Sequence, residues 1–363
     1  MKILGINISH DPSIAQITDD QIDFVHDEPR FRRNKWWTPE PGNCQFLAIP
    51  RTVVDRPDHV VIATFDRRQL GLFTDNKTQF DRSVGDSVME FCSDHVMTRT
   101  NIETLHDMHE GIDMEEDTKG DVAIAEEITE EQLEGEFSLE YQHHLYHAYC
   151  GHALSPWKDE PVIAIVWDGG GAQTHYETHP NFQEMETIYR CEPATLPLLQ
   201  WQRLSNHRFC DALSSAFPNM PWDMAFTTQS ETIDNTVFDS RPSMGMNFSM
   251  LSKHFGADPE GRGAGKIMGM ASYGRNLFAG YNNFDVAQRL ELESYDYSVS
   301  IIRDAIEKNP DISKIVLSGG FSLNCTNNYK YLSEFPDHEF FVDPIPHDGG
   351  TALGACLHKR NTL

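Results

Sequence analysis

The chain has 363 residues, 39% of them hydrophobic and 23% charged, which allows a sizeable core and suggests about two domains. Its 29 Lys and Arg stand against 56 Asp and Glu, and the net charge of −27 disfavours a general nucleic-acid or membrane-surface binder. No apolar run approaches the ~20 residues of a membrane-spanning helix, and the start of the chain is unlike a signal peptide. The seven cysteines are scattered without a C-x-x-C pair, as in reduced proteins. We therefore expect a soluble, cytoplasmic protein.

The first 64 residues predict a small sheet. Three apolar segments at 3–8, 14–18 and 22–26 are separated by Asp-Pro and Asp-Asp, which predicts an antiparallel meander with tight turns. A fourth strand is expected at 60–64.

A basic run follows the third predicted strand and places Arg30, Arg33 and Lys35 near its end. In so acidic a chain, this run is either an anion-binding site or the ion-pairing partner of an acidic stretch. Residues 107–140 are that stretch, with 14 acidic side chains against one Lys. We interpret it as a solvated helix or an insertion without a catalytic role.

A helix is expected over 141–150, with His143 and His147 on one face because they are four residues apart. Two imidazoles at this spacing can reach one metal ion, but a carboxylate from elsewhere must complete the site. In a chain with 17 His, the spacing alone also arises by accident.

The second half opens with an echo of the first. A strand at 162–168, a glycine turn and a strand at 172–177 repeat the strand–turn–strand plan of residues 3–18. This echo predicts two related lobes that meet near 155–160 and enclose a cleft. Residues 195–260 show no clear period, so no elements are predicted there. Near the end we expect strands at 315–318 and 339–343, and a helix beginning within 348–356.

Glycine turns follow two of these strands. Exposed backbone N–H groups in such turns can cradle a phosphate, and Lys266 could add a positive charge. The turns match neither a Walker A loop nor G-x-G-x-x-G, and tight structural turns are the alternative interpretation. The glycines are Gly169, Gly170 and Gly171 in the first turn and Gly319 and Gly320 in the second.

Taken together and in this order, the motifs resemble those of the O-carbamoyltransferases, the family of nodulation-factor and antibiotic carbamoyltransferases. The resemblance is to the amino-terminal module and runs from Met1 to about Gly354. The motifs are Ile3-Leu-Gly-Ile6 with His10-Asp11, Glu28-Pro-Arg-Phe-Arg-Arg33, His143-His-Leu-Tyr-His-Ala148, Val166-Trp-Asp-Gly-Gly-Gly171, Gly265-Lys-Ile-Met-Gly-Met-Ala271, Gly319-Gly-Phe-Ser-Leu-Asn324 and Asp348-Gly-Gly-Thr-Ala-Leu-Gly354.

The resemblance implies an α/β fold of the actin-like, sugar-kinase-like type, similar to that of the tRNA threonylcarbamoyl transferases. Two RNase H-like lobes would surround a central cleft, lobe I at 1–157 and lobe II at 158–363. It also implies that Asp348 supplies the carboxylate for His143 and His147. The family metal looks like iron(II), and this ligand set also accepts zinc or manganese.

The resemblance implies further that the donor is carbamoyl adenylate, made from carbamoyl phosphate and ATP. Its adenosine is expected near Gly319, Gly320 and Asn324, and its phosphate near the turn at 169–171. An acceptor hydroxyl would attack the carbamoyl carbon. His10, beside Asp11, is the candidate base, since an imidazole titrates near working pH. Arg33 and Lys35 would help hold an anionic group.

Three departures from the family pattern bear on the function. The family's carboxy-terminal domain, which forms carbamoyl adenylate, is expected to be absent from these residues. A separate protein could supply the donor, the sequence could be part of a longer chain, or this module could accept its donor in another way. Ala172 follows the glycine turn where the family usually has Glu, and the acidic stretch is richer than usual. The acceptor could be a sugar, another small molecule or a hydroxymethylated nucleotide, with polymeric nucleic acid disfavoured. The alternative is a module that binds or hydrolyses adenine nucleotides, or one subunit of a two-protein carbamoylation system.

Overall fold

The computed structural model describes residues 1–7, 11, 13–27, 58–63, 143–176, 179–206, 230–258, 263–275 and 282–363. The basic run at 28–35 and the acidic stretch at 107–140 lie outside these residues, as do His10, Arg33 and Lys35. The chain divides into two compact units, unit 1 with residues 1–149 and 348–363 and unit 2 with residues 150–347. Each unit is described by itself.

Unit 1 contains a four-stranded sheet in the order β3-β2-β1-β4. The strands are β1 (Lys2–Asn7), β2 (Ser13–Thr18), β3 (Gln21–Asp27) and β4 (His59–Ala63). The first three pair antiparallel, and β4 runs parallel to β1. The predicted meander and the fourth strand are therefore confirmed.

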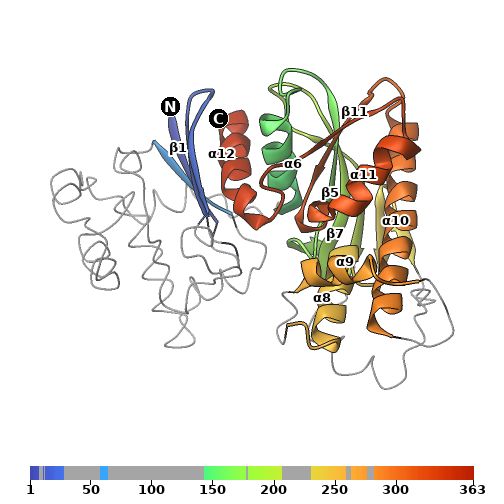
Figure 1. The fold of residues 1–363 in the computed structure, drawn as a ribbon. Coiled ribbons are helices and arrows are strands. Elements are labelled where there is room, and N and C mark those ends of the chain that lie inside the picture. The colour runs from blue at the N-terminus through green and yellow to red at the C-terminus, as the bar shows by residue number, and fades with distance from the viewer. Residues whose placement is uncertain are drawn as a thin grey trace, which may run out of the picture. The chain divides into compact units, whose positions relative to one another are not determined.

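Helix α12 (Thr351–Thr362) covers this sheet and packs against β1 and β2 (Figure 1). Two glycines allow the close approach of backbones. A Cβ atom on Gly5 would lie 2.0 Å from the carbonyl oxygen of Ala352, and one on Gly354 would lie 1.9 Å from that of Tyr146. Tyr146 belongs to α6 (His143–Leu154), so α12 contacts both β1 and α6 at glycine positions.

Unit 2 contains an eight-stranded sheet in the order β12-β11-β5-β7-β8-β10-β9, with β6 added on β7. Its strands are β5 (Val162–Trp167), β6 (Gln173–Tyr176), β7 (His179–Cys191), β8 (Leu198–Ser205), β9 (Glu231–Ile233), β10 (Thr236–Asp239), β11 (Lys314–Ser318) and β12 (Glu339–Val342). Every residue of β5 is buried, as its continuous apolar run predicts.

Helices pack on this sheet and close the core of unit 2 (Figure 1). They are α8 (Met244–His254), α9 (Ala264–Ala271), α10 (Asn283–Lys308) and α11 (Cys325–Glu334), and a short 3₁₀ turn η2 (Gly320–Leu323) precedes α11. Unit 1 has a similar short turn, η3 (Asp348–Gly350), before α12. The core joins Ile163, Trp167 and Leu317 of the sheet to Phe248 and Leu290 of the helices. Among the described residues, no helix has the length and apolar character needed to cross a membrane.

The two sheets repeat one plan. In unit 1 the order β4-β1-β2-β3 has one parallel pair followed by two antiparallel pairs, and β11-β5-β7-β8 of unit 2 has the same sequence of directions. This repetition confirms the predicted α/β, duplicated actin-like fold.

Two details differ from the sequence predictions. The segment 172–177 is not the antiparallel partner of β5, because the 13-residue β7 pairs with β5 through its second half and with β6 through its first. The compact units also differ from the predicted lobes of 1–157 and 158–363. Residues 348–363 belong with unit 1, since α12 packs on β1 and β2.

Candidate functional site

The two histidines of α6 approach each other closely. Their Nε2 atoms lie 3.1 Å apart, and their rings meet nearly edge to face at 84°. His143 and His147 are one helical turn apart, which brings both imidazoles to one face of α6. Both are buried, with exposed fractions of 1% and 0%.

Asp348 completes a three-residue group with them, which we call the triad. Its Oδ1 lies 3.5 Å from Nε2 of His143 and 3.8 Å from Nε2 of His147, and its side chain is also buried. The structure thus brings together the three residues that the sequence analysis assigned to a metal.

The triad fits a divalent metal in both shape and chemistry. Its three ligand atoms form a triangle with edges of 3.1, 3.5 and 3.8 Å. A point about 2.0 Å from all three corners exists, which is the usual distance from a nitrogen or oxygen ligand to a first-row metal. Two imidazoles and one carboxylate suit iron, zinc or manganese. A cation would also neutralise the buried carboxylate.

Asn7 and Gly354 hold the parts of the triad in place. Asn7 is the last residue of β1. Its side-chain Nδ2 donates to the carbonyl oxygen of Asp11 at 2.8 Å and to that of Asp348 at 2.9 Å. The hydroxyl of Thr351 donates to the same Asp348 carbonyl at 2.6 Å. At Gly354, α12 lies directly on the Tyr146 carbonyl, one residue before His147. These contacts fix Asp348 beside α6.

Of the predicted catalytic residues, only Asp11 lies within the described part of the chain. It is buried, and its carbonyl shares the Asn7 amide with Asp348. Asn7 itself is missed by the sequence analysis, because one polar residue at the end of an apolar strand is a weak signal. His10 and Lys35 stay predictions.

In unit 2, the two glycine turns meet at one carboxylate. Oδ1 of Asp168 accepts from the backbone N–H of Gly169 at 2.7 Å and from that of Gly320 at 3.1 Å. Gly319 has φ +86°, and a Cβ atom there would lie 2.4 Å from the Trp167 carbonyl oxygen, so this position requires glycine. Asp168 therefore joins the two turns that the sequence places far apart.

The turn at 169–171 is hydrogen-bonded to Glu184 of β7 and has open space beside Gly169. The N–H of Gly171 donates to the Glu184 carbonyl at 2.7 Å, and the N–H of Ala172 donates to the Glu184 carboxylate at 3.0 Å. A carboxylate from β7 thus contacts Ala172. By contrast, a Cβ atom on Gly169 would meet no described residue within 4 Å, and one on Gly170 would meet Gln183 Oε1 at 3.6 Å and Met246 Cε at 4.0 Å. Packing therefore does not require glycine at 169, although the Gly169 N–H and C=O are both hydrogen-bonded within the chain.

The other predicted donor-binding residues differ in their surroundings. Asn324 is buried, and its side chain caps α11 and donates to the Glu291 carboxylate at 3.1 Å. Burial raises the pKa of Glu291, while the hydrogen bond from Asn324 opposes that shift. Lys266 is exposed, and its Nζ donates to the carbonyl of Ala257 at 2.7 Å.

The chain is similar to known proteins in both sequence and structure. A family model described as carbamoyltransferase N-terminus matches residues 2–290. The nodulation protein NolNO of Sinorhizobium fredii is 44% identical over 52 residues, which cover 14% of this chain and 8% of NolNO. The structure of T. kodakarensis HypF is similar at 10% identity and a TM-score of 0.48, over 99% of this chain and 47% of HypF.

A further similar structure is the activator of the 2-hydroxyisocaproyl-CoA dehydratase from Clostridium difficile with bound ADPNP. It has 9% identity and a TM-score of 0.44, over 100% of this chain and 95% of the activator. The chain therefore spans about half the length of HypF, and its match to NolNO covers a small part of that protein.

Proposed function

Because the chain belongs to the carbamoyltransferase N-terminus family, we propose that it transfers a carbamoyl group from carbamoyl adenylate to the hydroxyl group of an acceptor. The acceptor class is a sugar, another small molecule or a hydroxymethylated nucleotide. The observation that carries the proposal is the buried triad of His143, His147 and Asp348, whose ligand atoms converge on one point.

The triad would hold a divalent metal. When bound there, such an ion supplies a Lewis acid that polarises the donor and offsets negative charge in the transition state. The chain's own part is to fix the ligands, which the contacts of Asn7, Thr351 and Gly354 support. Rigid support of this kind is what metal ligands require.

In unit 2, the donor's phosphate would lie in the open space beside Gly169 and Gly170, and its adenosine near Gly319, Gly320 and Asn324. The proposal is supported by the open space at Gly169 and by the Asp168 carboxylate that joins both turns. Lys266 would have to leave the Ala257 carbonyl to reach a phosphate.

The reaction balances without an oxidant or reductant. The acceptor oxygen forms a bond to the carbamoyl carbon, the bond from that carbon to the phosphate oxygen breaks, and AMP leaves. The hydroxyl proton passes to a base, for which we propose His10. Its neighbour Asp11 shares the Asn7 amide with Asp348, which supports a role for this turn beside the triad.

The test uses the full chain loaded with Fe²⁺, Zn²⁺ or Mn²⁺ in separate samples. Synthetic carbamoyl adenylate is added with a panel of sugars, hydroxylated small molecules and hydroxymethylated nucleotides, and products are read by mass spectrometry. We expect one carbamoyl group on a member of the panel, with AMP released in equal amount. If no acceptor is modified and the donor is not consumed, the proposal is wrong.

Parallel samples with carbamoyl phosphate and ATP decide how the donor is made. A product with carbamoyl adenylate but none with these precursors indicates that the donor is made outside these 363 residues. Release of phosphate from ATP without any carbamoyl donor would instead favour an ATP-hydrolysing module.

A further inference from the structure

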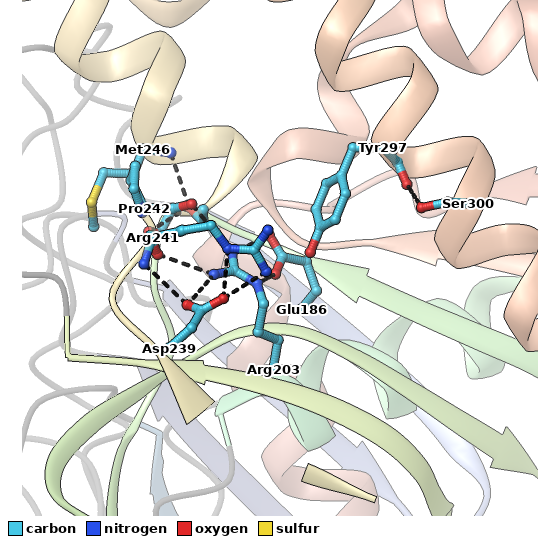
Figure 2. A network of polar contacts seen from close by, with 10 residues as sticks. Glu186, Arg203, Asp239, Arg241, Pro242, Met246, Tyr297 and Ser300 are labelled. Carbon is cyan, nitrogen blue, oxygen red and sulfur yellow. Dashed lines mark hydrogen bonds and ion pairs between the residues drawn. The ribbon is translucent and has the colours of Figure 1, made fainter. Parts of the chain in front are cut away.

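Four charged side chains form a cluster in unit 2, three of them buried and the fourth, Arg241, 37% exposed at its edge. Figure 2 shows Glu186 of β7, Arg203 of β8, Asp239 of β10 and Arg241, which together we call the arginine cluster. Arg203 is 2% exposed, and the carboxylates of Glu186 and Asp239 are fully buried. Two positive and two negative charges balance within the cluster.

All five N–H groups of the Arg203 guanidinium have an acceptor. Three bonds go to carboxylates, at 2.6 and 3.0 Å to the two oxygens of Glu186 and at 2.9 Å to Asp239. The other two go to the backbone carbonyl oxygens of Arg241, at 3.0 Å, and Pro242, at 3.2 Å. A planar guanidinium has five donors in a fixed geometry, so this arrangement fixes the backbone as well as the charges.

Asp239 binds the N–H groups of Arg241, whereas Arg203 binds the carbonyls of Arg241 and Pro242. Its Oδ2 accepts from Nε of Arg241 at 2.7 Å, and its Oδ1 accepts from the Arg241 backbone N–H at 3.0 Å. Figure 2 also shows the ring of Tyr297 directed toward Glu186. Burial and the charge of Glu186 raise the pKa of the Tyr297 phenol, so this side chain adds no charge. The residues just before α8 are thus tied to three strands.

The next residue, Ser243, connects this segment to the glycine turn. Its hydroxyl donates to the Gly169 carbonyl at 2.8 Å and accepts from the Met246 N–H at 3.0 Å as the N-cap of α8. Gly245 lies so close that a Cβ atom there would be 2.9 Å from the nitrogen of Gly169. The first turn of α8 therefore rests on the peptide bond between Asp168 and Gly169.

We propose that Arg203 is a positioning residue for the glycine turn at 168–171, acting through the carbonyls of Arg241 and Pro242 and the hydroxyl of Ser243. A buried ion cluster of this size adds little stability compared with apolar packing, because desolvation offsets the attraction. Its fixed geometry serves orientation instead. The inference rests on the proposed function only in the identity of the ligand at the turn.

The test is a double-mutant cycle of Arg203→Lys and Ser243→Ala. Hydrogen–deuterium exchange in a peptide spanning 166–172 reports the turn directly, since the amides of Gly169, Gly171 and Ala172 are hydrogen-bonded. AMP affinity by isothermal titration calorimetry reports its function. We expect each single variant to speed exchange there and to weaken AMP binding by about 3- to 10-fold, the loss of roughly one hydrogen bond.

Because both residues act through one connection, the double variant should lose no more AMP affinity than the more strongly affected single variant. Independent effects on affinity would instead multiply. Ser243→Thr keeps the hydroxyl and should restore exchange and affinity. Arg190→Lys is the matched control, since Arg190 lies on β7 with a half-exposed partner, Asp311. It should leave the turn unchanged.

Multiplying effects, or unchanged exchange at 166–172 in both single variants, would overturn the proposal. If the native chain binds no AMP, the donor assignment fails while exchange still tests the connection. If Arg203→Lys does not fold, Asp239→Asn takes its place in the cycle, because it is isosteric and removes a charge from the same anchor.

Discussion

The triad of unit 1 and the core of the arginine cluster of unit 2 are both buried and polar, yet they differ in how their groups are matched. In the cluster, each guanidinium N–H of Arg203 faces an acceptor, and the charges cancel. In the triad, two imidazole nitrogens and a carboxylate oxygen lie 3.1 to 3.8 Å from one another and surround one point. The cluster is complete as a structural element, whereas the triad is suited to receive an ion from outside.

Buried polar groups in this chain thus serve two purposes, the positioning of backbone segments and the binding of a ligand. A cluster that satisfies itself fixes backbone segments, here the start of α8. Imidazole nitrogens and a carboxylate oxygen that surround one point are instead arranged as metal ligands are.

Arg203→Met should have the largest effect on stability. It leaves the buried carboxylates of Glu186 and Asp239 without their partner, and removal of one member of a buried pair costs about 3–5 kcal/mol. Urea unfolding monitored by circular dichroism measures the loss. The control is Arg190→Met, whose partner Asp311 is more than half exposed and whose loss should be much smaller, because solvent screens an exposed pair. Equal losses in the two variants would remove the distinction between the pairs.

Gly354→Ala tests the support of the triad. The added Cβ would lie 1.9 Å from the Tyr146 carbonyl oxygen and must push α12 away from α6, at a cost of about 1–3 kcal/mol. The same displacement should weaken metal binding, because Asp348 directly precedes α12. Gly265→Ala is the matched control, since its Cβ would meet nothing within 4 Å. If Gly354→Ala behaves like the control in urea unfolding, the helices do not meet at this position.

His152 gives the smallest effect and a contrast with the triad histidines on the same helix. Burial lowers its pKa from the ordinary 6.5, while bonds to the carbonyls of Glu160 and Trp157 oppose that shift. Below pH 6.5 the unfolded chain binds a proton at this site before the folded chain does, so its contribution to stability falls as pH falls. His152→Gln should flatten the pH dependence of unfolding just below pH 6.5. An unchanged slope there would show that His152 does not contribute.

Much of the fold could be predicted, because its signals are local. Short apolar segments separated by Asp-containing turns predicted β1 to β3, and an apolar run predicted β5. The prediction that the segment 172–177 pairs with β5 was wrong, because β7 takes that place. The sequence of a strand does not by itself show which strand it pairs with. Residues 195–260 gave no prediction, since Arg203 and Asp239 look like surface residues but are buried through pairing.

The candidate site was predictable to a different extent for each residue. Helical spacing alone paired His143 with His147, but Asp348 is about 200 residues away and came only from the family resemblance. Asn7 and Ser243 escaped prediction, because a single amide or hydroxyl acts through tertiary contacts. The part of Asp168 that joins the two glycine turns also depends on the folded arrangement.

The most direct test of the triad is the metal content of the full chain by elemental analysis. After loading with Fe²⁺, Zn²⁺ or Mn²⁺ and removal of unbound ions, we expect about one ion per chain for at least one metal. His143→Ala and Asp348→Asn should each lose it, whereas His152→Ala, on the same helix, should keep it. Metal content that stays the same in both ligand variants, or a native chain that retains none of the three metals, would contradict the account.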